Sequence, residues 1–129
     1  MKVTVKHFDK EHGIKNKKLY ETFIKFLQEI IPIKIDILIN LVDKRIGDMT
    51  TGSRSNDSTL KILTKGRLNR DIMRTLAHEW VHEHQRTVLK RDAGQNIGGK
   101  NEDEANALAG SIIKKFEKRF PNFEDKMYE

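Results

Sequence analysis

The sequence has no cysteine at all. A disulfide, a thiolate zinc site and a cysteine nucleophile are therefore excluded, and any metal site in this chain must use histidine, aspartate or glutamate. The N-terminal stretch MKVTVKHFDKEHG also lacks the apolar segment of a signal peptide. Together, these two absences lead us to expect a protein of the reducing cytoplasm.

Long apolar runs are missing as well. No stretch approaches the roughly 20 apolar residues that are needed to span a bilayer, so we expect no membrane partner. The chain has 129 residues, of which 36% are hydrophobic and 34% are charged. That length is enough for one hydrophobic core and too short for two, so residues 1–129 are expected to form a single domain.

The positive charge of the chain is not concentrated in one segment. The formal net charge is +6, and lysine and arginine are scattered from Lys2 to Lys126, with local clusters at Lys15–Lys18 and Lys114–Arg119. Such a charge permits attraction to nucleic acid or to acidic proteins, but the scatter is more typical of a solvated surface. Nucleic acid therefore stays a secondary candidate partner, and the sequence leaves the oligomeric state open.

Proline is scarce, and both prolines follow segments in which apolar residues recur at helical spacing. One helix is expected over residues 16–30, shortly before Pro32, and another over residues 101–120, where Pro121 stops it. A third helix is expected between them. It would begin with Asn69 as its N-cap and end before Gly94.

Strands are expected in three short segments that alternate or are rich in β-branched residues, namely residues 2–8, 33–42 and 58–64. The last two either form a hairpin or lie side by side in one sheet, and the residues between them are mostly turn formers. The pattern predicts a small α+β domain with three main helices and a short mixed β-sheet. Its parts are a strand–helix–strand sheet half (1–65), a helical half (66–120) and a loosely held tail (121–129).

Three histidines fall within seven residues in the segment AHEWVHEH. His78 and His82 are four residues apart on the predicted helix, so both imidazoles point to one side and can reach one ion. Glu79 lies about 100° around the helix, where a carboxylate can take a proton from a metal-bound water. His84 points away from the pair. The H-E-x-x-H pattern therefore predicts a metal site, against the alternative of solvated helix histidines.

A catalytic zinc usually has three protein ligands and one water. No histidine follows His84, and His7 and His12 are not expected to bind the ion. The third ligand is then expected to be a carboxylate, unless it is an upstream histidine or is absent. Acidic residues stand together at the start of the last predicted helix, at positions 102–104.

Helical phase separates these three acids. Glu102 shares the buried stripe of the helix, which also contains Ala105, Ala109, Ile112, Ile113 and Phe116. Asp103 is expected on the exposed side, and Glu104 forms a capping-box-like start with Asn101. A carboxylate at the end of an apolar face needs a cation partner. Glu102 is therefore the preferred third ligand and Glu104 the second choice, while Asn106 could accept the outer N–H of a ligating histidine.

These motifs carry a resemblance to a known family. An HExxH helix followed by a glutamate on the next helix resembles the gluzincin metallopeptidases. The segment EDEANALA is similar to the E-x-x-A-N/D-x-F-A signature of the ImmA/IrrE-type metallopeptidases, with Leu108 where that family has phenylalanine. The resemblance covers about the second half of the chain and implies a minimal zinc peptidase with a small zincin-like fold.

The resulting hypothesis is a zinc-dependent peptidase. His78, His82 and Glu102 are expected to hold Zn²⁺ with water in the fourth position, and Glu79 is expected to act as general base and then to protonate the leaving amine. The substrate would be a protein or peptide. By the resemblance, the strand at residues 58–64 could bind it by β-augmentation. The group that stabilises the oxyanion stays open among Tyr20, Tyr128, His7 and Arg54.

A second hypothesis is a non-catalytic, zinc-containing binding module. In that case a fourth protein ligand, for example His84 or Asp103, would close the coordination shell. The basic surface would then hold nucleic acid or a partner protein.

Overall fold

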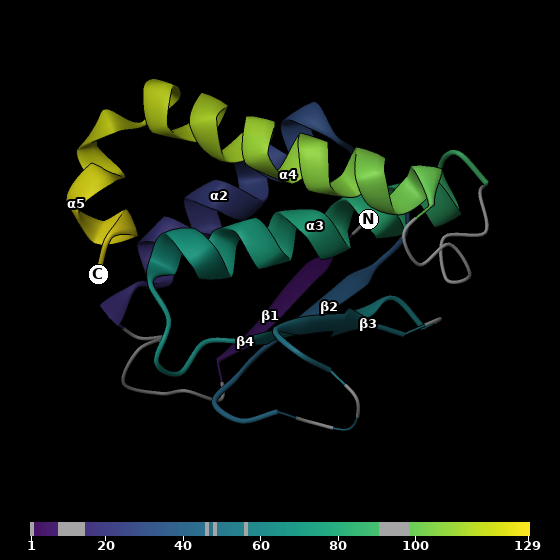
Figure 1. Ribbon diagram of the computed structural model, residues 1–129, viewed down its shortest axis with the longest axis horizontal. Helices are drawn as coiled ribbons and strands as arrows, with labels where there is room; N and C mark the ends of the chain where they lie inside the picture. Colours follow the sequence, from purple (N-terminus) through teal and green to yellow (C-terminus); the bar gives the residue numbers. More distant parts are fainter. Residues whose placement is uncertain (1, 8–14, 46, 48, 56, 91–98) are drawn as a thin grey trace.

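A four-stranded sheet carries the helices of this protein on one of its faces, as the computed structural model shows (Figure 1). The structure describes residues 2–7, 15–45, 47, 49–55, 57–90 and 99–129. The strands are β1 (Val3–His7), β2 (Ile37–Val42), β3 (Gly52–Arg54) and β4 (Thr59–Leu63), in the spatial order β1-β2-β4-β3. The first three strands in that order are parallel, and β3 runs antiparallel to β4. The sheet is therefore mixed, as predicted.

Period-2 alternation explains which side of the sheet is covered. In β2, Ile37, Ile39 and Leu41 are buried, whereas Leu38 and Asn40 between them are only partly buried. Leu60 and Ile62 of β4 repeat this pattern and are fully buried. Alternating side chains of a strand point to opposite faces, so one apolar row from each of these two strands meets the helices.

The sequence left open whether the strands expected at residues 33–42 and 58–64 form a hairpin or lie side by side. These strands are β2 and β4, and they are parallel neighbours, with Leu38 opposite Thr59 and Val42 opposite Leu63. The hairpin partner of β4 is instead β3, which lies in the segment where only turns were expected. β3 has three residues and contains Gly52, so it is too short to show any periodicity.

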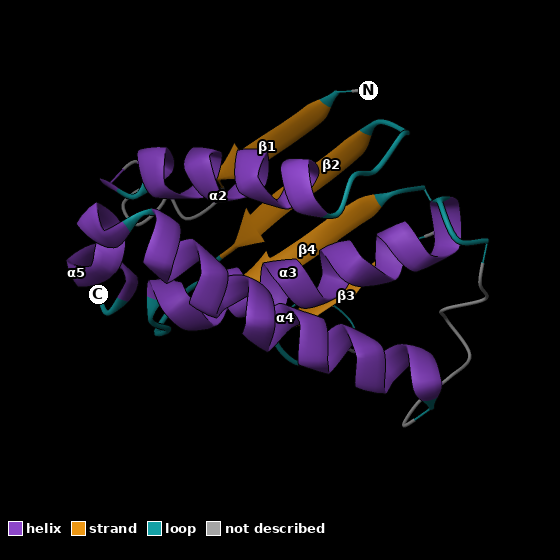
Figure 2. Ribbon diagram, turned by 90° about the horizontal axis from the view of Figure 1, so that it is seen from above, coloured by secondary structure: helices purple, strands orange, loops and turns teal. Residues whose placement is uncertain are grey.

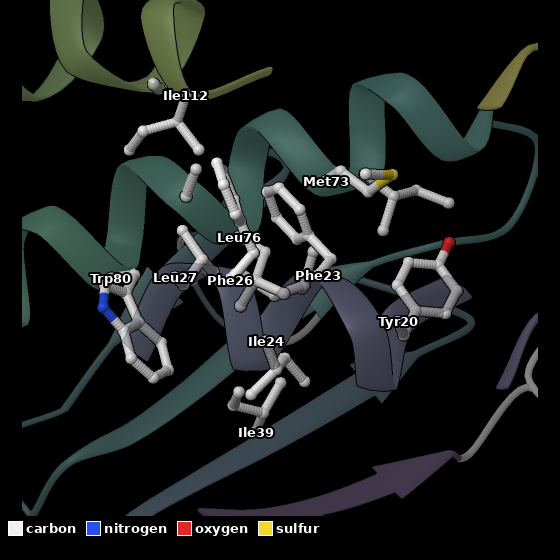
Figure 3. Packing of buried hydrophobic residues seen from close by; sticks show 14 of the residues in the cluster. Tyr20, Phe23, Ile24, Phe26, Leu27, Ile39, Met73, Leu76, Trp80 and Ile112 are labelled. Atoms are coloured by element: carbon white, nitrogen blue, oxygen red, sulfur yellow. The ribbon is translucent and has the colours of Figure 1, made fainter. Parts of the chain in front are cut away.

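Three long helices lie on one side of the sheet, namely α2 (Lys17–Ile30), α3 (Asn69–Thr87) and α4 (Lys100–Arg119) (Figure 2). Helix α4 lies over α3, farther from the strands (Figure 1). The expected α+β domain with three main helices is confirmed. Their apolar stripes meet in one core, where Phe23 and Leu27 of α2 pack near Leu76 and Trp80 of α3 (Figure 3). Each such side chain contributes about 1.5–3 kcal/mol when fully buried. No helix in the described residues is both long and apolar enough to cross a bilayer.

The predicted helix caps are wrong in both cases. Helix α3 has Leu68 at its N-cap and Asn69 as its first residue, and the Asn69 side chain binds Tyr20 and the Lys126 carbonyl instead. Helix α4 has Gly99 at its N-cap and begins at Lys100. Asn101 is therefore the second residue of the helix and not its N-cap, as the predicted capping box required.

The tail is not loosely held, contrary to the prediction. Residues after α4 form a 3₁₀ turn (η2, Pro121–Phe123) and the short helix α5 (Glu124–Met127). Met127 is fully buried in the core. The Glu129 carbonyl accepts a hydrogen bond from the Asn69 backbone N–H at 2.8 Å. The end of the chain therefore packs onto the start of α3.

Candidate metal centre

Two imidazoles of α3 and one carboxylate of α4 converge on a single point. The Nε2 atom of His78 lies 2.8 Å from Oε1 of Glu102, and Nε2 of His82 lies 2.9 Å from Oε2 of the same carboxylate. One ligand atom from each residue lies within 4.8 Å of the others. The two imidazole centroids are 4.7 Å apart, which is the neighbourhood expected of residues one helical turn apart.

Small side chains allow this convergence. Ala105 and Ala109 of α4 and Ala77 of α3 are fully buried in the core, and α3 and α4 lie side by side in both ribbon views (Figures 1 and 2). Without bulky side chains at these positions, the two helices approach closely enough for Glu102, in the first turn of α4, to reach both histidines.

Gln85 determines which nitrogen of His82 faces the carboxylate. Its amide NH₂ group donates to the Asn101 carbonyl at 3.0 Å and to Glu104 Oε1 at 3.1 Å. These two acceptors orient the amide, so the Gln85 oxygen is the atom that lies 2.9 Å from Nδ1 of His82. Because that oxygen can only accept, Nδ1 carries the proton.

A neutral His82 therefore presents the lone pair of Nε2 to a carboxylate oxygen. Two acceptors at 2.9 Å repel each other unless a proton or a cation lies between them. At His78, the Nε2 atom is buried and has no hydrogen-bond partner in the described residues, although Glu102 is nearby. The donor set of two imidazole nitrogens and one carboxylate oxygen is one that binds catalytic zinc. The residues present therefore fit a zinc ion.

Burial shifts the pKa values of two residues in this cluster. It lowers the pKa of His78, and the neighbouring His82 and the Arg74 guanidinium also disfavour protonation, against the attraction of the Glu102 carboxylate. The neutral imidazole that results is the form that binds metals. Burial also raises the pKa of Glu79, and the nearby Glu102 carboxylate adds to this effect. A carboxylate with a raised pKa is a stronger base than an exposed one.

A cleft of about 300 Å³ gives access to these side chains. Gly52 of β3 and the preceding Thr50 and Thr51 form one wall, and Asn106 and Ala109 of α4 form the other. His78 and Glu79 of α3 line its floor, together with Arg74 and Thr75. The cleft therefore lies between the edge strand of the sheet and the last long helix.

The other predicted site residues take different places. Glu104 binds Gln85. Asn106 is exposed and lines the cleft, while the partner of the outer nitrogen of His82 is Gln85. Asn106 was expected to accept the outer N–H of a ligating histidine. At His82, Gln85 accepts this hydrogen bond instead. His84 donates to the Pro32 carbonyl at 2.7 Å, on the far side of α3 from the cluster.

The four residues that were considered for oxyanion stabilisation lie in different parts of the structure. Tyr20 donates to Asn69 at the start of α3, and Tyr128 is exposed in the tail. Arg54 acts electrostatically on Glu79, and its buried Nη2 atom has no hydrogen-bond partner among the described residues. The side chain of His7 and the whole of His12 lie outside the described residues.

Sequence reasoning missed a buried acid next to the second histidine. The Glu83 side chain is completely buried and pairs with Arg54 of β3 at 2.9 Å and with Arg86 of α3. Ser58, which has a positive φ of 63°, donates to the same carboxylate at 2.6 Å. Glu83 directly follows the HExxH motif in the sequence. Its role in holding β3 against α3 is visible only in the structure, where Arg54 of β3 pairs with it.

Comparisons with protein-family models, with curated proteins and with solved structures found no match to this chain.

Proposed function

We propose that this protein is a zinc-dependent peptidase. The single observation that supports the proposal best is the tautomer of His82, which Gln85 constrains so that a bare lone pair faces the Glu102 carboxylate. A divalent cation between the two groups relieves that conflict and is shared with His78. In this proposal, His78, His82 and Glu102 hold the metal.

Glu79 has the properties that a general base needs. It is more than nine-tenths buried, lines the cleft and has a raised pKa, because burial disfavours its charged form. Bound zinc supplies a Lewis acid that brings the pKa of a coordinated water near 7 and polarises a carbonyl. Glu79 accepts the proton of the attacking water and passes it to the leaving amine. Arg54 is the candidate that stabilises developing negative charge.

A peptide substrate fits the edge of the sheet better than its interior. β4 cannot bind an added strand, because β2 and β3 cover both of its edges, which corrects the prediction for residues 58–64. β3 is the edge strand beside the cleft, and Gly52 at its start lines that cleft. The proposal therefore assigns β-augmentation to β3.

The alternative of a closed, structural zinc site has less support. His84 is engaged with Pro32, and Asp103 is exposed. Neither belongs to the group of potential metal ligands in the described residues, which contains three side chains. Three protein ligands leave a position for water. The cytoplasm remains the proposed location, since a chain without cysteine is suited to a reducing compartment.

Glu79→Gln tests the peptidase proposal directly. The variant should bind zinc like the wild type and lose hydrolysis of unfolded protein substrates by at least about 100-fold, the size typical of a lost general base. Glu21→Gln, on the exposed face of α2, is the matched control and should keep full activity. Undiminished turnover in Glu79→Gln would remove Glu79 from the mechanism, and a zinc-loaded wild type without hydrolysis would contradict the peptidase assignment.

A further inference from the structure

A basic stripe extends along α3 from the candidate metal centre. Arg70, Arg74, His78 and His82 are each four residues apart, so they follow one side of the helix. Arg74 lies one turn from His78, and both side chains line the cleft at the candidate metal centre. The positive side of α3 thus begins beside the histidine pair and continues towards the start of the helix.

A matching stripe on α4 faces the same seam. Glu102, Asn106, Gly110 and Lys114 are also spaced by four residues. Gly110 leaves space in the middle of this stripe, because a Cβ atom built there would lie 3.8 Å from the Arg74 guanidinium. A side chain longer than that of alanine at this position would therefore compete with Arg74 for the seam.

The two stripes enclose a groove of about 490 Å³. Arg74 and Asn106 line both this groove and the cleft that contains His78 and Glu79, so the two hollows share a wall. The groove is lined by three cationic side chains, Arg70, Arg74 and Lys114, and by no carboxylate among the described residues. A ligand that lies in the cleft can therefore continue into a positive groove.

Two of these charges are not neutralised by the protein. Arg70 pairs with Glu117 at 2.7 Å, at the far end of the groove. Arg74 and Lys114 are exposed, and within the described ranges neither has an ion pair or a hydrogen bond to a carboxylate. Nearby Ser111 adds a hydroxyl group to the groove wall. This is the chemistry that binds a carboxylate from outside, through a charged pair and hydrogen bonds.

The spacing of the stripe defines where such a carboxylate would lie. Along a helix that rises about 1.5 Å per residue, Arg74 is roughly 6 Å and Arg70 roughly 12 Å from His78. An extended peptide advances about 3.3 Å per residue. If a peptide bond of the substrate lies at the metal centre, the groove therefore lies beside substrate side chains about two to four residues from that bond.

We propose that this groove binds an acidic side chain of the peptide substrate, two to four residues from the bond that is cleaved. The inference rests on the proposed peptidase function and names its substrate class. Two uncompensated cations in one groove match a single carboxylate. A nucleic-acid interface generally contacts several phosphates and buries about 1,000–2,500 Å² of protein surface.

The test uses the zinc-loaded full-length protein and a random decapeptide library, with cleavage sites located by mass spectrometry. Aspartate and glutamate should be enriched at positions two to four residues from the cleaved bond, by about tenfold over asparagine and glutamine. In the double variant Arg74→Gln, Lys114→Gln, the ratio should fall to within about twofold of unity. Lys118→Gln, an exposed control later on α4, should keep the wild-type ratio.

Binding separates this inference from the peptidase proposal. A fluorescent acidic peptide should bind the zinc-loaded protein more tightly than its amide counterpart, and the double variant should lose this difference. If this occurs without any cleavage, the peptidase proposal fails and the groove stands. The groove proposal is overturned if acidic residues are not preferred, if the preference survives in the double variant, or if that variant loses only binding of single-stranded DNA.

Discussion

At the scale of one residue, the side-chain amide of Gln85 determines which nitrogen of His82 can bind a metal ion. Gln85 is fully buried and makes three hydrogen bonds, two as donor to α4 and one as acceptor from His82. The first two bonds determine the direction of the third. The side chain that positions the metal ligand is thus itself positioned by the helix that supplies Glu102.

Replacing Gln85 should therefore weaken metal binding without removing a ligand. Gln85→Leu removes the acceptor for Nδ1 of His82, and zinc affinity should fall by about 10- to 100-fold, as for other residues that orient a ligating histidine. Gln85→Glu keeps the acceptor for Nδ1 of His82 but places a carboxylate against Glu104 and the Asn101 carbonyl, so its zinc affinity should lie between those of the wild type and Gln85→Leu. Competition with a coloured chelator measures both affinities. Equal zinc affinity in a folded Gln85→Leu variant would show that the tautomer is not constrained by this residue.

Glu83 is the second buried residue with a clear energetic role. Burial alone would raise its pKa, but hydrogen bonds from Ser58, Arg86 and Arg54 outweigh that effect, so the pKa of Glu83 is lowered. Glu83→Gln would leave two arginines without their shared anion. Breaking such a buried pair costs about 3–5 kcal/mol in the free energy of unfolding, measured by denaturant titration. Glu124→Gln, in the exposed tail helix, is the control and should cost little.

The same pKa shift makes this stabilisation depend on pH. A carboxyl group with a lowered pKa in the folded state stabilises the protein above its unfolded pKa of about 4.3. That contribution is lost as the pH falls through the folded pKa. The stability difference between wild type and Glu83→Gln should therefore be constant near neutral pH and shrink below about pH 4.3. A difference that grew on acidification would contradict the ion-pair assignment.

At the scale of elements, the close contact between β3 and α3 forms one wall of the cleft. A Cβ atom at Gly52 would lie 2.6 Å from Thr75 Cγ2 and 3.3 Å from Glu79 Cγ. Those distances leave no room for a methyl group, because the partners belong to a packed helix. Only glycine lets the edge strand approach the helix this closely.

Gly52→Ala should consequently push β3 away from α3. Overpacking of this kind costs about 1–3 kcal/mol, so thermal unfolding should begin at a lower temperature. Peptide hydrolysis should fall more than zinc binding, because Glu79 moves and the three ligands do not touch Gly52. Ser53→Ala, the next residue on β3, is the control. If hydrolysis and stability are unchanged in Gly52→Ala, β3 does not form the wall of the cleft.

At the scale of the whole molecule, the elements that were predicted well are those with long periodic patterns. The buried stripe of α4, which begins near Glu102 and Ala105, could be recognised because apolar residues recur at helical spacing along a helix of twenty residues. The pairing of His78 with His82 follows from helical spacing alone. These patterns are local, so they survive in any tertiary arrangement.

The features that the sequence did not reveal depend on contacts between distant segments. β3 is three residues long, and its pairing with β4 defines it as a strand. The tail is held because Met127 enters the core and Asn69 binds the chain end. Gln85 orients His82 because α4 holds its amide, and the nearest of these contacts in sequence, the Asn101 carbonyl, is sixteen residues away. No local pattern encodes such partners.

Zinc stoichiometry in two matched variants tests the central claim most directly. Metal analysis of the reconstituted wild type should give about one zinc per chain, the content expected for one site of three ligands and water. Glu102→Ala should lose most of this zinc. Glu104→Ala removes only one of the two acceptors that orient Gln85, so it should retain most of the zinc. A wild type that takes up no zinc, or a Glu104→Ala variant that loses as much as Glu102→Ala, would contradict the account.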